Sequence, residues 1–173
     1  MLALLALHLG LALAAPAAGA RLGRRVFLLV ALAPAATAVW AAPQAAGVLD
    51  GTAVVQRASW VPGLDLTLDL RLDPLGLLMV TLVSGIVTLV FLYCARYFGA
   101  QQAGVGRFAG VRTAFAGAML GLVLADDLLL LYVFWELTSV TSYLLIGFHD
   151  EDAESRRAAQ QALLVTTFGG LVM

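Results

Sequence analysis

The stretch from Leu128 to Gly147, with the sequence LLLLYVFWELTSVTSYLLIG, restricts how this chain can fold more than any other feature. About 20 residues at ~1.5 Å each cross a hydrocarbon core of ~30 Å as one helix. Its single charged residue, Glu136, lies near the middle. A charge at that depth costs about 2.5–3.5 kcal/mol on insertion scales, so such residues usually face the protein interior and serve a function. The sequence therefore predicts a transmembrane helix with a buried carboxyl group.

Three hydroxyl side chains fall on the predicted helical face of Glu136. Residues four before, three after and seven after a position share its side of a helix. We therefore predict a supporting polar face made of Tyr132, Ser139 and Tyr143. A carboxyl in this setting can exchange a proton or await a cationic partner. The alternative is a glutamic acid that only holds a neighbouring helix, a task for which serine or threonine costs less.

Composition defines the class of protein. Hydrophobic residues make up 62% of the 173 residues, and the mean hydropathy is +0.95. These values are those of an integral membrane protein embedded in a lipid bilayer. The net charge of −1 and the absence of a basic patch exclude a nucleic-acid partner. No P-loop, HExxH, CxxC or Ser-His-Asp arrangement occurs, so we expect a transport protein rather than an enzyme, with no cofactor and no metal site.

The apolar runs predict an all-α polytopic membrane protein of about six transmembrane helices. The first run ends in Ala18-Gly19-Ala20, which resembles a signal-peptidase site, but its arginines follow the apolar run instead of preceding it. We interpret it as a helix. The expected helices, each with its features, are 1–20, 26–42 with a kink at Pro34, 74–98 capped by Asp73, 108–125 with a Gly117–Gly121 packing seam, 128–147 capped by Asp126-Asp127, and a last, truncated one from 158 to 173.

Residues 43–73 predict a small β-hairpin between the second and third helices. Leucines alternate with polar residues from Leu64 to Asp73, which is the period of a half-buried strand. Pro62-Gly63 is a turn signal, and Val54 to Trp60 can supply the partner strand.

Arginine positions predict the orientation in a cell (plasma) membrane. The positive-inside rule places arginine-rich loops in the cytoplasm. It therefore puts the N-terminus and the hairpin outside. After the fifth helix, His149 to Asp152 form an acidic cluster that we interpret as a solvated loop rather than a divalent-cation site. The cytoplasmic arginines are Arg21, Arg24, Arg25, Arg96, Arg107, Arg112, Arg156 and Arg157.

Several ordered stretches resemble a known family. Phe134-Trp135-Glu136-Leu137-Thr138-Ser139 resembles the corresponding segment of the A-type subunit of Mrp-type multisubunit Na⁺/H⁺ antiporters, which shares a superfamily with subunit L (subunit 5) of respiratory complex I. The further matching stretches are Trp60 to Pro62, Leu70 to Gly76, Val83 to Ile86, Gly117 to Val123 and Leu164 to Gly170.

The resemblance implies a fold of about fourteen helices with inverted repeats and broken helices. It implies that Glu136 is a proton-relay residue set against a lysine on a seventh helix, which lies beyond Met173. Residues 1–173 then form an N-terminal fragment of a subunit that exchanges H⁺ for Na⁺ or another monovalent cation beside other membrane subunits. Two alternatives remain: a proton-translocating subunit of NADH–quinone oxidoreductase or of a membrane-bound hydrogenase, and a truncated scaffold that transports nothing.

Overall fold

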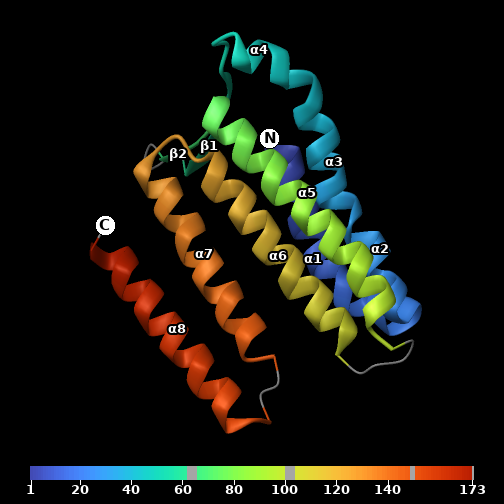
Figure 1. The fold of residues 1–173 in the computed structure, drawn as a ribbon. Helices are drawn as coiled ribbons and strands as arrows, with labels where there is room; N and C mark the ends of the chain where they lie inside the picture. Colours follow the sequence, from blue (N-terminus) through green and yellow to red (C-terminus); the bar gives the residue numbers. More distant parts are fainter. Residues whose placement is uncertain (62–65, 100–103, 149–150, 173) are drawn as a thin grey trace.

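Long helices form a bundle with a small β-hairpin at one end (Figure 1). The computed structural model describes residues 1–61, 66–99, 104–148 and 151–172. Its elements are α1 (Leu2–Leu22), η1 (Gly23–Arg25), α2 (Val26–Val30), α3 (Leu32–Ala41), η2 (Ala42–Gln44), α4 (Ala45–Leu49), β1 (Val54–Val61), β2 (Leu66–Leu72), α5 (Pro74–Tyr97), α6 (Val105–Leu124), α7 (Leu128–Ile146) and α8 (Ala153–Val172).

Among the described residues, four helical stretches are long and apolar enough to cross a membrane: Leu2–Leu49, Pro74–Tyr97, Val105–Leu124 and Leu128–Ile146. The first is folded back on itself near Gly23, where α2 and α3 turn to pack against α1. Charged and amide side chains in the first turns of α8 lower its hydropathy below that of the other four stretches. The prediction of a helical, multi-pass membrane protein is confirmed.

The second predicted helix is interrupted just before Pro34. Pro34 has no N–H to donate to the carbonyl of Val30, and α2 ends at Val30 while α3 begins at Leu32. Helical structure then continues through η2 and α4 to Leu49, beyond the predicted end at Ala42. Short alanine-rich segments retain helical dihedrals even where the chain is no longer apolar enough for the bilayer.

The β-hairpin follows the predicted alternation. β1 and β2 pair antiparallel, with Val54 opposite Leu72 and Gln56 opposite Leu70. Leu70 and Leu72 are fully buried whereas Arg71 is exposed, so the leucine face covers the bundle. The predicted turn at Pro62-Gly63 lies outside the described residues.

Two hydrogen bonds attach the hairpin to the helices. The Asp126 amide donates to the Asp69 carbonyl at 2.9 Å, next to an isolated bridge between Leu70 and Ala125. The Leu2 amide donates to Gln56 Oε1 at 3.0 Å. The hairpin therefore holds the start of α1 and the α6–α7 turn at the same end of the bundle.

Both predicted aspartate caps are present. Asp73 Oδ1 accepts from the Gly76 amide at 2.7 Å, with Pro74 at the first helical position. Asp127 Oδ1 accepts from the Leu130 amide at 2.8 Å. Each cap satisfies a backbone donor that the first turn of a helix leaves without a partner.

Glycines of α6 bring α1 close to its backbone. A Cβ on Gly106 would lie 2.9 Å from the carbonyls of Ala15 and Pro16, and one on Gly110 would lie 2.7 Å from the Ala12 carbonyl. The predicted seam at Gly117 and Gly121 serves two neighbours. The backbone of Gly117 packs against His8 of α1, whereas the backbone of Gly121 packs against a side chain of α7.

The helix ends that carry most of the predicted cytoplasmic arginines lie at the end of the bundle opposite the hairpin (Figure 1). These arginines belong more to helices than to loops. Arg96 and Arg107 lie in the last turn of α5 and the first turn of α6, and Arg112 lies well inside α6. Long arginine side chains reach the interface from the first or last turn of a helix. The Arg112 Nε atom, in contrast, is buried and has no hydrogen-bond partner among the described residues.

Candidate functional site

The carboxyl group of Glu136 lies against the backbone of α8. Glu136 Oε1 is buried and has no hydrogen-bond partner among the described residues. A Cβ added to Gly170 would lie 2.7 Å from this oxygen. Gly170 is itself buried, although its neighbours Gly169 and Leu171 are exposed. The carboxyl therefore occupies space that any side chain at position 170 would fill.

Trp135 forms a second wall of this space. Its indole Nε1 donates to the Thr166 carbonyl at 3.5 Å, and its Cδ1 and Nε1 would each lie 3.2 Å from a Cβ on Gly170. The bond is long, at the limit of hydrogen-bonding distance. Trp135 thus joins α7 to α8 beside the carboxyl and orients the face of α7 that carries Glu136.

The predicted hydroxyl face is not hydrogen-bonded to the carboxyl in the described part of the chain. Ser139 is 5% exposed, and its hydroxyl donates to the Trp135 carbonyl of its own helix at 3.1 Å. Tyr132 is half-buried on α7, and Tyr143 lines a cavity near the end of that helix. The role of these three residues beside Glu136 stays a prediction.

The opposite side of α7 is apolar. A Cβ on Gly121 of α6 would overlap the ring of Phe134. Phe134 also packs against a buried cluster formed by β2 and neighbouring helices, which includes Leu70 and Leu124. Phe134 therefore faces α6 through hydrocarbon, whereas the Glu136 carboxyl lies against α8.

A buried oxygen without a hydrogen-bond partner calls for a chemical explanation. Nearly all buried polar atoms in folded proteins have a partner, and an exception points to a bound proton, water or ion, or to a functional group that changes partners. Glu136 Oε1 can accept a proton or a donor that arrives along α8. The described residues contain no group of three His, Cys, Asp or Glu side chains that could hold a metal ion, and His149 and Asp150 of the acidic cluster lie outside them.

The sequence did not identify Gly170, Trp135 and Thr166 as parts of this site. The Gly169-Gly170 pair in an apolar helix was the available signal, because adjacent glycines are costly in helices. That signal names no partner. Only the packing of α7 against α8 reveals which glycine meets the carboxyl.

Two family models match separate parts of the chain, and one of these parts contains the site. One, described as "NADH-Ubiquinone oxidoreductase (complex I), chain 5 N-terminus", matches residues 60–109. The other, described as "NADH:quinone oxidoreductase/Mrp antiporter, TM", matches residues 125–173, which include Glu136 and Gly170. The chain belongs to this superfamily of antiporter-like membrane subunits.

Within the superfamily the chain is similar to the A-type subunits of Mrp antiporters. It is 45% identical to the A1 subunit of the Na⁺/H⁺ antiporter of Staphylococcus aureus strains JH9 and Newman over 123 residues, which are 71% of this chain and 15% of the relative. Its fold matches a chain of the Mrp complex from Dietzia sp. DQ12-45-1b with a TM-score of 0.82 and 35% identity, over 97% of this chain and 18% of that one.

A more distant structure shares the fold alone. A chain of the membrane-bound sulfane sulfur reductase, an archaeal respiratory membrane complex, matches with a TM-score of 0.78 and 17% identity, over 96% of this chain and 34% of that one. The chain thus spans less than a fifth of the length of its antiporter relatives.

Proposed function

We propose that this chain is the N-terminal transmembrane part, residues 1–173, of the A-type subunit of a multisubunit cation/proton antiporter. It works in the plasma membrane beside other membrane subunits and helps to move H⁺ in exchange for Na⁺ or another monovalent cation. Its role is transport and not enzymatic catalysis. The observation that carries this proposal is the buried Oε1 of Glu136, which has no partner among the described residues and lies in a segment that matches the Mrp antiporter family model.

The geometry supports a relay through the α8 side of Glu136. Phe134 closes the α6 side with hydrocarbon, whereas Gly170 presents bare backbone to the carboxyl. The interface of α7 and α8 is therefore the route by which we expect a proton to reach and leave Oε1. The hydrogen bond from Trp135 to the Thr166 carbonyl holds this interface together. The carboxyl can therefore exchange one hydrogen-bond partner for another while α7 stays in place.

The decisive experiment is Glu136→Gln in the full-length antiporter protein, assembled in its complex. Glutamine keeps the shape of the side chain but cannot take or release a proton. We expect cation-dependent proton movement in inverted membrane vesicles to be lost while protein levels stay normal on immunoblots. Glu136→Asp should retain part of the activity, because the carboxyl survives about one methylene nearer its own helix.

Asp126→Asn is the matched control. Asp126 is exposed at the water boundary, where ionisation costs little. Its substitution should change transport only modestly. Normal exchange in Glu136→Gln, or an equal loss in both variants, would contradict the relay.

We also propose the orientation that the arginines favour: N-terminus and hairpin outside, arginine-rich end in the cytoplasm. Gly51 is exposed beside the hairpin. Gly51→Cys, in a background with Cys94→Ser, should react with a membrane-impermeant thiol reagent in intact cells. Labelling that requires permeabilised cells would reverse the orientation.

A second candidate is a proton-translocating subunit of a complex I-type or hydrogenase-type complex. The match of residues 60–109 to the complex I chain 5 model favours it. Proton movement that starts on cation addition, without any redox substrate, distinguishes the antiporter from this alternative.

A further inference from the structure

Arg112 of α6 is a charged side chain that the proposed relay does not use. It lies seven residues after Val105, where α6 begins, which is roughly 10 Å along the helix. Its Nε atom is buried and has no hydrogen-bond partner among the described residues. A charge within a membrane-spanning segment costs about 2.5–3.5 kcal/mol on insertion scales, so such groups almost always pair with another polar group. The described part of the chain does not supply the partner that Arg112 requires.

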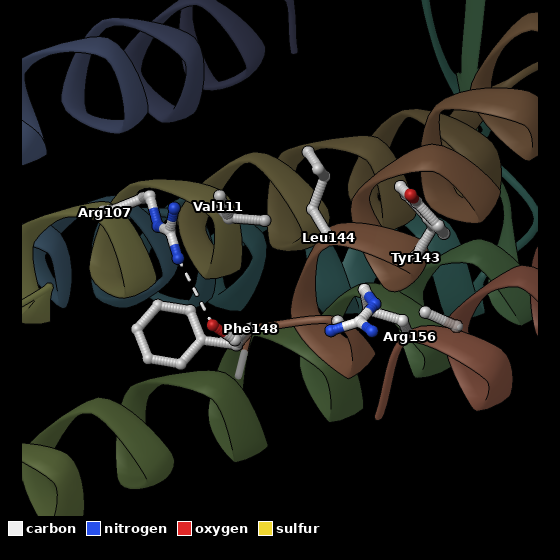
Figure 2. Close-up of a pocket in the computed structure, with 8 residues that line it drawn as sticks. Arg107, Val111, Tyr143, Leu144, Phe148 and Arg156 are labelled. Carbon is white, nitrogen blue, oxygen red and sulfur yellow. Dashed lines mark hydrogen bonds between the residues drawn. The ribbon is translucent and has the colours of Figure 1, made fainter. Parts of the chain in front are cut away.

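Arg107 of the same helix has the partner that Arg112 lacks. Figure 2 shows the Arg107 guanidinium beside Phe148, where Nη2 donates to the Phe148 carbonyl at 3.2 Å. Arg107 is exposed and lies at the end of the bundle where α7 finishes. Arg112 lies five residues deeper, roughly 7.5 Å along α6. No hydrogen bond or ion pair joins Arg112 to a described residue.

The Arg112 guanidinium lies on the side of α6 that is next to α5. It acts electrostatically on the Cys94 thiol of α5. Its two Nη atoms, unlike Nε, are not buried, although they donate to no described residue. Arg112 as a whole is half-buried. The end of the guanidinium therefore opens between α5 and α6, onto the surface of a membrane-spanning part of the bundle.

The α5 side of this opening is apolar and aromatic. Tyr97 lies three residues after Cys94 and Ile86 lies eight before it, which places both on its side of α5. Both are exposed, and Tyr97 stacks on the exposed Tyr93 with 5.3 Å between the ring centres. Together with Arg112, these three side chains form a surface that we name the α5–α6 face. It offers apolar contact beside one positive charge.

The described carboxylates lie elsewhere. Asp126 and Asp127 follow the opposite end of α6, next to the hairpin (Figure 1). The carboxyl of Glu136 lies against α8. The acidic residues within 151–154 come after the end of α7. The anion that balances Arg112 therefore has to come from outside the described residues.

We propose that the α5–α6 face docks a transmembrane helix of another membrane subunit, and that an aspartate or glutamate of this helix pairs with Arg112. A carboxylate matches both the charge and the planar donor fork of a guanidinium. At this depth a membrane-spanning helix is the element that can carry it. A lipid phosphate belongs at the interface, where Arg107 lies, and not five residues deeper. This pairing presupposes the proposed place of the chain in a multisubunit complex.

The test is Arg112→Met in the full-length protein, expressed with its complex. Methionine keeps a long side chain with good helix propensity and removes the charge. The carboxylate of the neighbouring subunit is then left buried and alone, which is strongly unfavourable. We expect the amount of that subunit retained during purification in mild detergent to fall roughly tenfold, which is about 1.4 kcal/mol. Arg112→Lys keeps the charge and should retain most of it. Immunoblots of the membranes before extraction separate loss of the protein from loss of its neighbour.

Arg24→Met is the matched control, because Arg24 is an exposed arginine of the bundle. It removes the same charge and should leave retention unchanged. Full retention in Arg112→Met, or an equal loss in Arg24→Met, overturns the docking alone, since the native complex is intact in both cases. A native protein that purifies without any other subunit overturns the docking and the proposed function together.

A second measurement keeps Arg112 in place. Phe115 is half-buried and lies three residues after Arg112, on the same side of α6. It is replaced by the photoreactive analogue p-benzoylphenylalanine, and the products formed on illumination of native membranes are identified by mass spectrometry. A product with a transmembrane helix of another subunit that contains Asp or Glu supports the docking. Products with lipid alone, or with other helices of the same polypeptide alone, overturn it.

Discussion

Phe134 and Glu136 are two residues apart on α7, and each lies against a glycine of a neighbouring helix. Phe134 fills the space that a side chain on Gly121 of α6 would take, and Glu136 fills the space at Gly170 of α8. Phe134 joins a buried hydrocarbon cluster, whereas Glu136 leaves one oxygen buried without a partner among the described residues.

A glycine at a helix–helix contact thus serves two different purposes on the two sides of α7. A glycine opposite an aromatic ring gives close packing, and that packing is satisfied as it stands. A glycine opposite a carboxyl removes a steric barrier but supplies no donor, so the contact stays chemically incomplete. Stability should therefore depend on the α6 side of α7, and transport on the α8 side.

The largest effect on stability is expected for Gly121→Val. The new side chain overlaps the Phe134 ring, and overpacking of a filled interface costs about 1–3 kcal/mol. The free energy of unfolding in mixed micelles should fall accordingly, and Phe134→Ala in the same chain should restore part of it. Gly85→Val is the control, because nothing lies within 4 Å of a Cβ there. Equal losses at both glycines would break the comparison.

Gly170→Ala should cost less, about 1 kcal/mol, because the obstructing atom ends a flexible side chain. Transport should nevertheless decline, since the methyl group displaces the carboxyl. Gly169→Ala is a neighbouring control with open space at its Cβ, and it should gain about 0.5–1 kcal/mol from helix propensity. Unfolding and cation-dependent proton movement are measured together. Unchanged transport in Gly170→Ala would remove this glycine from the site.

Trp135→Phe should lower the free energy of unfolding by about 0.5 kcal/mol, the low end for a lost hydrogen bond, because the bond to Thr166 is long. Trp40→Phe is the control, since the Trp40 indole donates to no described residue. Loss of transport beyond the loss of stability would show that Trp135 positions the α7–α8 interface. Identical behaviour of the two variants would deny it that role.

The smallest effect on stability is expected for Glu136→Gln, within about 0.5 kcal/mol. Oε1 has no described partner to lose, so the amide removes a function without removing a contact. A destabilisation as large as that of Gly121→Val would place Glu136 among packing residues. The comparison between the two sides of α7 would then fail.

Local signals in the sequence determined the helices, their caps and the hairpin. Hydropathy marked the transmembrane stretches, Asp73 and Asp127 began their helices as predicted, and leucine alternation identified β2. These features depend on residues a few positions apart, which is why they can be read without a fold. The central place of Glu136 in its helix followed from the same kind of count.

Tertiary packing alone decided what each helical face meets. Helical spacing placed Ser139 beside Glu136, yet the Ser139 hydroxyl donates to a carbonyl of its own helix. The sequence marked Gly121 as a packing residue and left Gly170 unassigned, and it named a partner for neither. In the structure, Gly121 meets Phe134 and Gly170 meets the carboxyl. A glycine specifies that a neighbour can come close and not which neighbour comes, because it has no side chain to select a partner.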